Sequence, residues 1–344
     1  MNEFNTPAPT QAAPIQTVPP RIAPADAVKN GIAYFLADLG VFSVVEGAQL
    51  IVGLAWGVGF ASLWAAGFFT GDVEAAFDNS LAYALALAQL LTLAVTMPWW
   101  WCRIRPRSFS SARDRDLPRG DASFMRVVGI ILLGVAMQMI ISYVLSLVLP
   151  MFPALEEGYD EMMNDGTTSE LSAISLLVVA VGAPISEEIA CRGLMLELSL
   201  RAVCPEWREA WRERGRRHHA RLPLGDVSAM RVPPARFWIA NLIQAVLFGI
   251  LHMNLVQGIY AGAMGLVFGW VFWRSGKMRY NICLHLVLNF SSYFVGVIDV
   301  VFGLFGPIVE LIAFIAMLVL GAVLFWLGTK EGQHPSRILP QFQR

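Results

Sequence analysis

Residues 126–150 read RVVGIILLGVAMQMIISYVLSLVLP, and after Arg126 this stretch contains no charged side chain. About 20 consecutive apolar residues are enough for a helix to cross the hydrocarbon core of a bilayer. We therefore predict a membrane helix here. Comparable apolar stretches occupy residues 40–69, 81–101, 171–199, 237–253, 255–273, 281–300 and 303–328. The sequence thus predicts an all-α fold, a polytopic membrane helix bundle of about eight transmembrane helices.

The composition of the whole chain agrees with this pattern. Of its 344 residues, 56% are hydrophobic and only 15% are charged. Soluble domains usually carry about 25% charged residues, so the composition excludes a soluble globular enzyme. The net charge of −1 provides no general attraction to nucleic acid, and we expect no nucleic-acid partner.

The chain divides into five parts by composition. Residues 1–28 contain six prolines and no apolar run, which predicts a disordered tail. We expect N-terminal membrane helices over residues 29–170 and a core that carries the polar motifs over residues 171–293. A last membrane helix (294–328) and a cytoplasmic tail (329–344) complete the chain.

Two features of the apolar pattern depart from a simple series of spans. The first stretch begins near Ile32 and is too long for one crossing, so we expect its start, with Asp38, to lie along the interface before the chain turns inward. The fifth and sixth stretches are short and joined by almost nothing polar. We expect their connection, near residues 253–256, to lie deep in the protein.

The charges of the connecting segments alternate along the chain. Residues 70–80 and 151–170 carry acidic side chains and no Lys or Arg, whereas residues 102–126 carry seven Arg and residues 201–236 carry nine. Positively charged loops stay on the cytoplasmic side of a membrane. The pattern predicts that both termini are cytoplasmic, and the absence of a targeting signal favours a multi-pass protein of a bacterial inner membrane.

The most informative residues are ionisable side chains inside the apolar stretches, because each costs roughly 2.5–3.5 kcal/mol at the centre of a membrane helix. Glu187 and Glu188 precede Arg192 in the fourth stretch. On a helix Glu188 and Arg192 form an i, i+4 ion pair, while Glu187 points about 100° away and stays free for chemistry. Pro184, one turn earlier, is expected to kink the helix. The structural alternative is a buried ion pair that holds helices together.

Three further polar residues follow on two later stretches. His252 ends the sequence Phe248-Gly-Ile-Leu-His252, and His285 and Asn289 share one helical face. Alone, a buried His or Asn is often only a packing residue. Together with the two carboxylates they suffice for a general base, a group that positions water, and donors to an oxyanion. The same side chains nearly suffice for a zinc site.

The sixth stretch contains Gly258, Gly262, Gly265 and Gly269. Small residues four apart allow two helix backbones to approach closely. We interpret them as a tight packing surface beside the polar residues.

The three motifs EExxxR (Glu187, Glu188, Arg192), FxxxH (Phe248, His252) and HxxxN (His285, Asn289) resemble, in this order, the signature of the CPBP family. This family comprises CAAX prenyl proteases of type II and bacteriocin-processing enzymes, and it is also known as the Abi family. The resemblance covers residues 171–293.

The resemblance implies an intramembrane endopeptidase that hydrolyses a peptide bond in a peptide or protein substrate at the bilayer. Glu187 would activate water, His252 would position it, and His285 and Asn289 would stabilise the oxyanion. Glu188 and Arg192 would be supporting, with Arg192 holding the carboxylates or the substrate terminus. Eukaryotic relatives cleave a prenylated C-terminal tripeptide.

Two questions stay open at the level of sequence. The family carries a metalloprotease label, so the cofactor is either none or a zinc ion held by Glu187, His252 and His285. The function is either proteolysis or a non-proteolytic role, as a membrane transporter with an intramembrane ion path or as a bacteriocin-immunity binding protein.

Overall fold

The computed structural model describes residues 24–68, 71–108, 117, 119–164, 172–209, 212 and 232–330. Within these ranges the chain forms helices and no strand. The main helices are α1 (Pro24–Ala65), α2 (Val73–Trp99), α4 (Asp121–Val148), α5 (Pro153–Asn164), α7 (Ala183–Glu188), α8 (Leu196–Val203), α10 (Pro234–Ile250), α11 (Leu255–Ser275), α12 (Met278–Ser292), α13 (Val295–Gly303) and α14 (Pro307–Gly328). The fold class predicted from the sequence is therefore confirmed.

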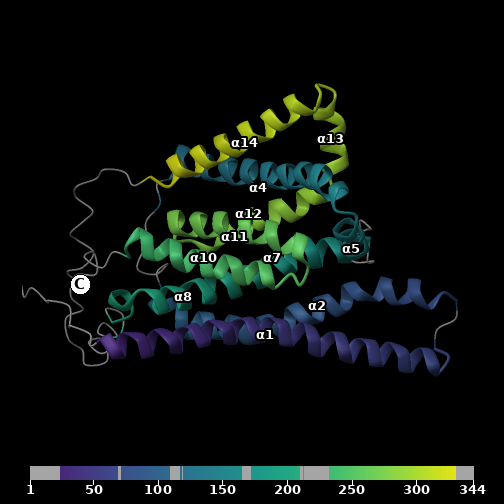
Figure 1. The fold of residues 1–344 in the computed structure, drawn as a ribbon, viewed down its shortest axis with the longest axis horizontal. Coiled ribbons are helices and arrows are strands. Elements are labelled where there is room, and N and C mark those ends of the chain that lie inside the picture. Colours follow the sequence, from purple (N-terminus) through teal and green to yellow (C-terminus); the bar gives the residue numbers. More distant parts are fainter. Residues whose placement is uncertain are drawn as a thin grey trace, which may run out of the picture.

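The long helices lie roughly along one direction and alternate in sense (Figure 1). The α1–α2 hairpin forms one side of the bundle and the α4–α14 pair forms the other, with α7, α8, α10, α11 and α12 between them. The described chain begins and ends at the same end of the bundle, on the left of Figure 1. The segment with the three polar motifs thus occupies the interior.

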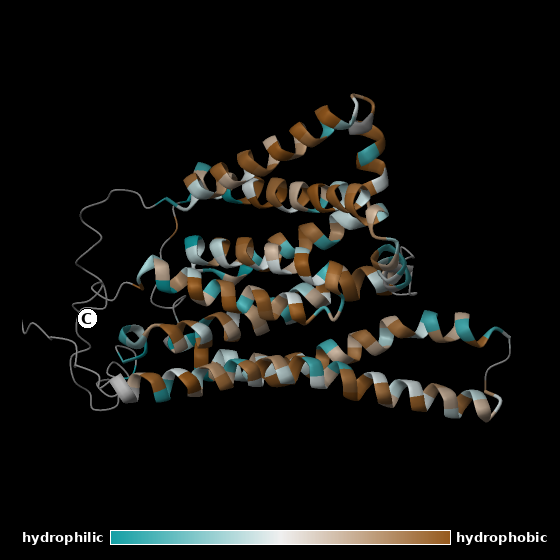
Figure 2. Cartoon of the chain, viewed as in Figure 1, coloured by the Kyte–Doolittle hydropathy of each residue, from teal (hydrophilic) through white to brown (hydrophobic). Residues whose placement is uncertain are grey.

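All eight predicted stretches are helical, but not all are long enough to span a membrane alone. Six helical segments of the described chain are long and apolar enough, namely Ala27–Ala65, Val73–Ile104, Asp121–Met151, Ala173–Val203, Leu255–Ser275 and Pro307–Gly328. The seventh stretch is bent by 74° between α12 and α13, and the fifth, α10, has only 17 residues. Large apolar side chains such as Leu54, Ile131 and Val319 are exposed on the outer helices. Figure 2 shows the same apolar character along α1, α4 and α14, as lipid contact requires.

The first helix corrects two expectations. It is continuous from Pro24 to Ala65, so its start does not lie along the interface, and it begins inside the range 1–28 that was expected to be a disordered tail. Residues 1–23 lie outside the described part of the chain. Asp38 is fully buried and accepts a hydrogen bond from the Ser199 hydroxyl of α8. Because α8 provides this partner, the helix can carry a carboxylate inside the bundle without turning to water.

The basic side chains gather at one end of the bundle, where some of them pair with glutamates such as Glu197 and Glu209. Apart from Arg192, the described Lys and Arg residues lie at the end where the described chain begins and finishes. The acidic helix α5 lies at the other end (Figures 1 and 2). Trp101 is 52% exposed near the basic end, where an aromatic side chain can lie at the membrane interface, whereas Trp100 is buried. Arg208, which was expected on a cytoplasmic loop, is also buried and donates to backbone carbonyls of Ala27 and Arg201.

Glycines set the closest helix contacts. The predicted packing surface on α11 is confirmed: Gly258 faces Gly249 of α10, and a Cβ atom on Gly265 would lie 3.1 Å from Ala245. A second surface joins α4 to α14, where a Cβ atom on Gly129 would lie 2.8 Å from the carbonyl oxygen of Gly321. Both pairs of helices depend on the absence of side chains at these positions.

We expect Gly321→Leu to destabilise the protein, because the new side chain would meet the backbone of Gly129 and Leu133 and force α14 away from α4. Overpacking lowers the free energy of unfolding by about 1–3 kcal/mol. The measurement is the melting temperature of the purified variant in detergent, which should fall. Gly57→Leu on α1 is the control, because nothing lies within 4 Å of a Cβ atom there. Equal melting temperatures for both variants would contradict the packing role of Gly321.

Candidate active site

The EExxxR motif lies on one helical path that includes two π-helical turns, Leu176–Gly182 and Ile189–Met195. In the first of them the backbone N–H of Ala183 donates to Val178 O, five residues back. The next donor in this register would be residue 184, but Pro184 has no N–H. The carbonyl of Val179 instead accepts a hydrogen bond of 2.9 Å from the Asn289 side chain of α12. The proline therefore creates the acceptor that orients Asn289.

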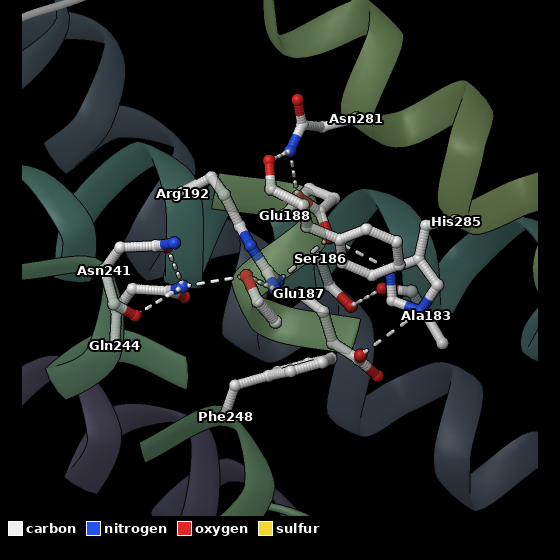
Figure 3. Close-up of polar contacts among 12 residues, drawn as sticks. Ala183, Ser186, Glu187, Glu188, Arg192, Asn241, Gln244, Phe248, Asn281 and His285 are labelled. Carbon is white, nitrogen blue, oxygen red and sulfur yellow. Dashed lines mark hydrogen bonds and ion pairs between the residues drawn. The ribbon is translucent and has the colours of Figure 1, made fainter. Parts of the chain in front are cut away.

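Glu188 is the centre of the polar interior. Its side chain is fully buried and lies 2.9 Å from Arg192 Nη1, so the predicted i, i+4 ion pair is present. The same carboxylate is 3.0 Å from His285 Nδ1 and 3.3 Å from Asn281 Nδ2, both on α12 (Figure 3). Three partners from two helices satisfy the charge, as a buried carboxylate requires.

Arg192 is enclosed by aromatic rings. Its guanidinium carbon lies 4.4 Å from the ring centroid of Phe248 and 4.8 Å from that of Phe268. Cation–π contacts of this kind are strongest when water is excluded, and Arg192 has no exposed surface. Its Nη2 also approaches the carbonyl of Gly265 at 3.4 Å. Arg192 therefore faces Glu188 and two rings and does not reach open space.

Glu187, the neighbouring carboxylate, has a different environment. Its side chain is 27% exposed, and its Oε2 lies 3.8 Å from His285 Nε2. It lines a partly open cavity, whereas Glu188 does not. The 100° turn between adjacent helical residues thus separates a carboxylate held by an arginine from one that faces open space.

His252 lies in the tight turn between α10 and α11. Met253, the next residue, has φ = 52°, a left-handed conformation that reverses the chain at once. The Asn254 side chain then accepts the backbone N–H of Gln257 and caps α11. His252 Nδ1 lies 2.8 Å from Phe248 O, so Nδ1 carries the hydrogen and Nε2 of a neutral ring is an acceptor. The connection near residues 253–256 was predicted to lie deep in the protein, but it does not: Met253 and Leu255 are exposed, and only the flanking His252 and Gln257 line the cavity.

The cavity has a volume of about 540 Å³ and brings the four predicted catalytic residues together. Glu187 of α7, His252 of the turn between α10 and α11, and His285 and Asn289 of α12 all line it, so three segments meet here. Its remaining walls come from α1, α2, α4, α5 and α11. Glu188 and Arg192 lie behind this surface and support His285. Their roles in catalysis stay predictions, but their placement has the geometry that a reaction centre needs.

Asn281 is a residue of the site that the sequence interpretation missed. It precedes His285 by one turn and donates to both Glu188 and the Phe268 carbonyl, the latter at 2.7 Å. A signal was present, because Asn281, His285 and Asn289 recur every four residues and therefore share a helical face. Gln244 was also missed; it donates to the Gly265 carbonyl beside Arg192.

The proposed zinc ligands do not form a metal site as they are placed. Among the residues that the structure describes, no group of three or more His, Cys, Asp or Glu side chains is arranged to hold a metal ion. His285 directs Nδ1 to Glu188 and Nε2 toward Glu187. Glu187, His252 and His285 share the cavity but do not converge on one point.

Comparison with known families agrees with this geometry. Residues 169–291 match the family model described as type II CAAX prenyl endopeptidase Rce1-like. Residues 169–291 are therefore similar to a CPBP-family intramembrane protease. Among curated proteins and among solved structures no match to the chain was found. The matched range includes every motif residue of the cavity, while α1, α2, α4 and α14 lie outside it.

We expect Glu188→Gln to destabilise the protein by roughly 3–5 kcal/mol, because it leaves Arg192 buried without its counter-ion. The measurement is thermal or denaturant unfolding of the purified variant in detergent. Glu187→Gln is the matched control, one residue away, and it should unfold like the wild type since its carboxylate faces the cavity. Wild-type stability of the Glu188 variant would contradict the role of this pair.

Proposed function

We propose that this protein is an intramembrane endopeptidase of the CAAX prenyl protease or bacteriocin-processing type, which hydrolyses a peptide bond with water activated by Glu187. The observation that carries the proposal is the division between two adjacent glutamates. Glu188 is engaged by Arg192, His285 and Asn281, whereas Glu187 directs its carboxylate into a cavity large enough for several residues of a peptide.

The reaction follows from the donors and acceptors that line the cavity. Glu187 removes a proton from water while Nε2 of His252 accepts the second hydrogen bond and orients the oxygen. The hydroxide attacks the peptide carbonyl, and the carbonyl π electrons move to the oxygen. The protonated Glu187 then gives its proton to the leaving nitrogen as the C–N bond breaks. One water is consumed, and a carboxylic acid and an amine are formed.

The side chains of His285 and Asn289 are suited to donate hydrogen bonds to the oxyanion. When both nitrogens of His285 carry hydrogen, Nδ1 donates to Glu188 and Nε2–H remains for the cavity. Asn289 uses one N–H for the Val179 carbonyl and keeps its second for a ligand. Donors fixed in this way stabilise charge that develops in the transition state. Because both side chains are oriented by fixed partners, they need no rearrangement during the reaction.

The non-proteolytic alternatives predict a different arrangement. An ion path requires a series of ionisable groups across the membrane region. The ionisable groups that line this cavity gather at Glu187, His252 and His285, together with three tyrosines nearer the acidic end. A binding protein has no need for a free carboxylate beside two imidazoles. The grouping therefore favours catalysis over transport or sequestration.

We expect Glu187→Gln to lower hydrolysis of an internally quenched peptide by about 10²–10⁴-fold, the usual contribution of a general base. The assay uses the purified full-length protein in lipid nanodiscs. Glu74→Gln, on the exposed first turn of α2, is the control and should keep full activity. Unchanged turnover in the Glu187 variant would refute the proposed base.

We expect catalysis without a bound metal, because a glutamate-activated water needs none. Enzyme treated with a chelator should keep its activity while its zinc content, measured by elemental analysis, falls far below one ion per chain. Loss of activity with chelator and recovery with zinc would contradict this expectation and would require the three candidate ligands to rearrange.

We propose that both termini are cytoplasmic and that the protein resides in a bacterial inner membrane. The separation of charge supports this orientation, since positively charged segments remain on the cytoplasmic side. The end of the bundle with α5 then faces away from the cytoplasm, and the described residues at the basic end face inward.

We expect cysteines placed at positions 160 and 279 to be labelled from opposite sides of the membrane. Both native side chains, Asp160 and Arg279, are exposed at opposite ends of the bundle. The exposed Cys102 and Cys283 are first replaced by serine. An impermeant maleimide added to intact cells should label position 160 and not position 279. Labelling of both from one side would contradict the proposed orientation.

A further inference from the structure

A carboxamide from outside the matched range lies against the turn that leads into the EExxxR motif. Gln89 of α2 lines the cavity, and its Nε2 donates a hydrogen bond of 3.2 Å to the carbonyl oxygen of Val178. The next carbonyl, that of Val179, accepts a hydrogen bond of 2.9 Å from Asn289 of α12. Two carboxamides, one from α2 and one from α12, therefore hold consecutive carbonyls of the π-helical turn Leu176–Gly182.

Gly182, at the end of this turn, makes room for the Gln89 side chain. A Cβ atom at Gly182 would collide with Gln89 Oε1 and would lie 3.3 Å from Gln89 Cδ. The carboxamide can lie against the backbone here only because glycine has no side chain. The hydrogen bond to Val178 and the contact with Gly182 hold both polar atoms of Gln89 in place, so the group is oriented before a ligand binds.

This orientation leaves the oxygen of the Gln89 carboxamide for a ligand. Nε2 is the donor to Val178, so Oε1 is the acceptor that remains. No hydrogen bond to this oxygen comes from the described part of the chain. Asn289 is complementary, because it keeps one N–H after binding Val179. The wall between α2 and α12 thus offers one acceptor and one donor, the two groups that a peptide unit needs as partners.

The spacing of these two groups fits the main chain of an extended substrate. Gln89 and Asn289 bind carbonyls of adjacent residues, whose Cα atoms are about 3.8 Å apart. An extended polypeptide advances about 3.3 Å per residue, so the two side chains can bind it within one or two residues of each other. In the interior of a helix each N–H is already bonded to a carbonyl of the same helix. An N–H that is available to Gln89 therefore belongs to an extended segment.

We propose that Gln89 is a substrate-binding residue, whose Oε1 accepts a hydrogen bond from the N–H of a peptide bond one or two residues away from the scissile bond. This inference rests on the proposed function and deepens it, because Asn289 serves the oxyanion at the same wall. α2 then holds the substrate in an extended conformation beside Glu187, whatever the side chains of that segment are. The contact is provided by a helix outside residues 169–291.

The test removes this hydrogen bond from the enzyme and from the substrate in turn. The probe is the internally quenched peptide of the activity assay, with its scissile bond located by mass spectrometry. At each other peptide bond within two residues of that bond, an ester replaces the amide, so that one N–H becomes an oxygen. The full-length wild type and Gln89→Met are compared in nanodiscs by kcat/KM for cleavage of the original bond. We expect one ester to lower the wild-type value by about three- to tenfold more than it lowers the value of Gln89→Met, the range for one hydrogen bond.

Two further variants separate substrate binding from a loss of folding. The ester penalty is a ratio measured within each enzyme, so it does not depend on the fraction of active protein. Leu87→Met, on the exposed surface of α2, is the control and should keep the wild-type penalty. Gly182→Ala retains Gln89 but places a Cβ atom where Oε1 lies, so it should lose the same penalty as Gln89→Met. If Gln89→Met is inactive, the penalty in Gly182→Ala decides.

The outcomes also separate this inference from the proposed function. Equal ester penalties in the wild type and in the Gln89 and Gly182 variants, with cleavage that depends on Glu187, would overturn the inference and leave the proposed function intact. No cleavage by the wild type, or equal cleavage by Glu187→Gln, would overturn the proposed function and the inference with it.

Discussion

The ion pair between Glu188 and Arg192 is the interaction on which the interior of this protein depends. A carboxylate and a guanidinium are both fully buried in an apolar bundle, 2.9 Å apart. Such a pair persists only when its remaining hydrogen-bonding groups find partners. Here Glu188 binds His285 and Asn281 of α12, and Arg192 contacts rings from α10 and α11. One pair therefore joins the helices that carry all three motifs.

The same constraint places the two adjacent glutamates, Glu187 and Glu188, in different surroundings. Because Glu188 must face Arg192 and α12, Glu187 faces the cavity, and His285 lies between them with one nitrogen toward each. The proline-interrupted turn adds Asn289 to the same wall by leaving the Val179 carbonyl without a backbone donor. The polar groups that hold the helices together and those proposed to act in catalysis thus share residues, so the candidate site is assembled by the interactions that stabilise the fold.

The helices outside residues 169–291 complete the site in a different way. α1, α2 and α4 provide most of the wall opposite Glu187, and this wall is uncharged. The distribution of charge over the whole bundle places the acidic segments near the cavity and the basic ones at the far end. The proposed chemistry therefore resides in the matched residues 169–291, while helices outside that range complete the cavity.

The sequence by itself determined the membrane class, the eight apolar stretches, the Glu188–Arg192 pair and the four cavity residues. These follow from local rules, because apolar length, helical spacing and the cost of a buried charge are independent of distant contacts. Tertiary structure alone decided that α1 is unbroken, that α12 bends into α13, and that Asn281 joins Glu188. It also decided that Arg192 faces a carboxylate and two rings instead of a substrate. Each of these depends on which helix lies alongside, since a buried polar group takes the partner that packing brings within hydrogen-bonding distance.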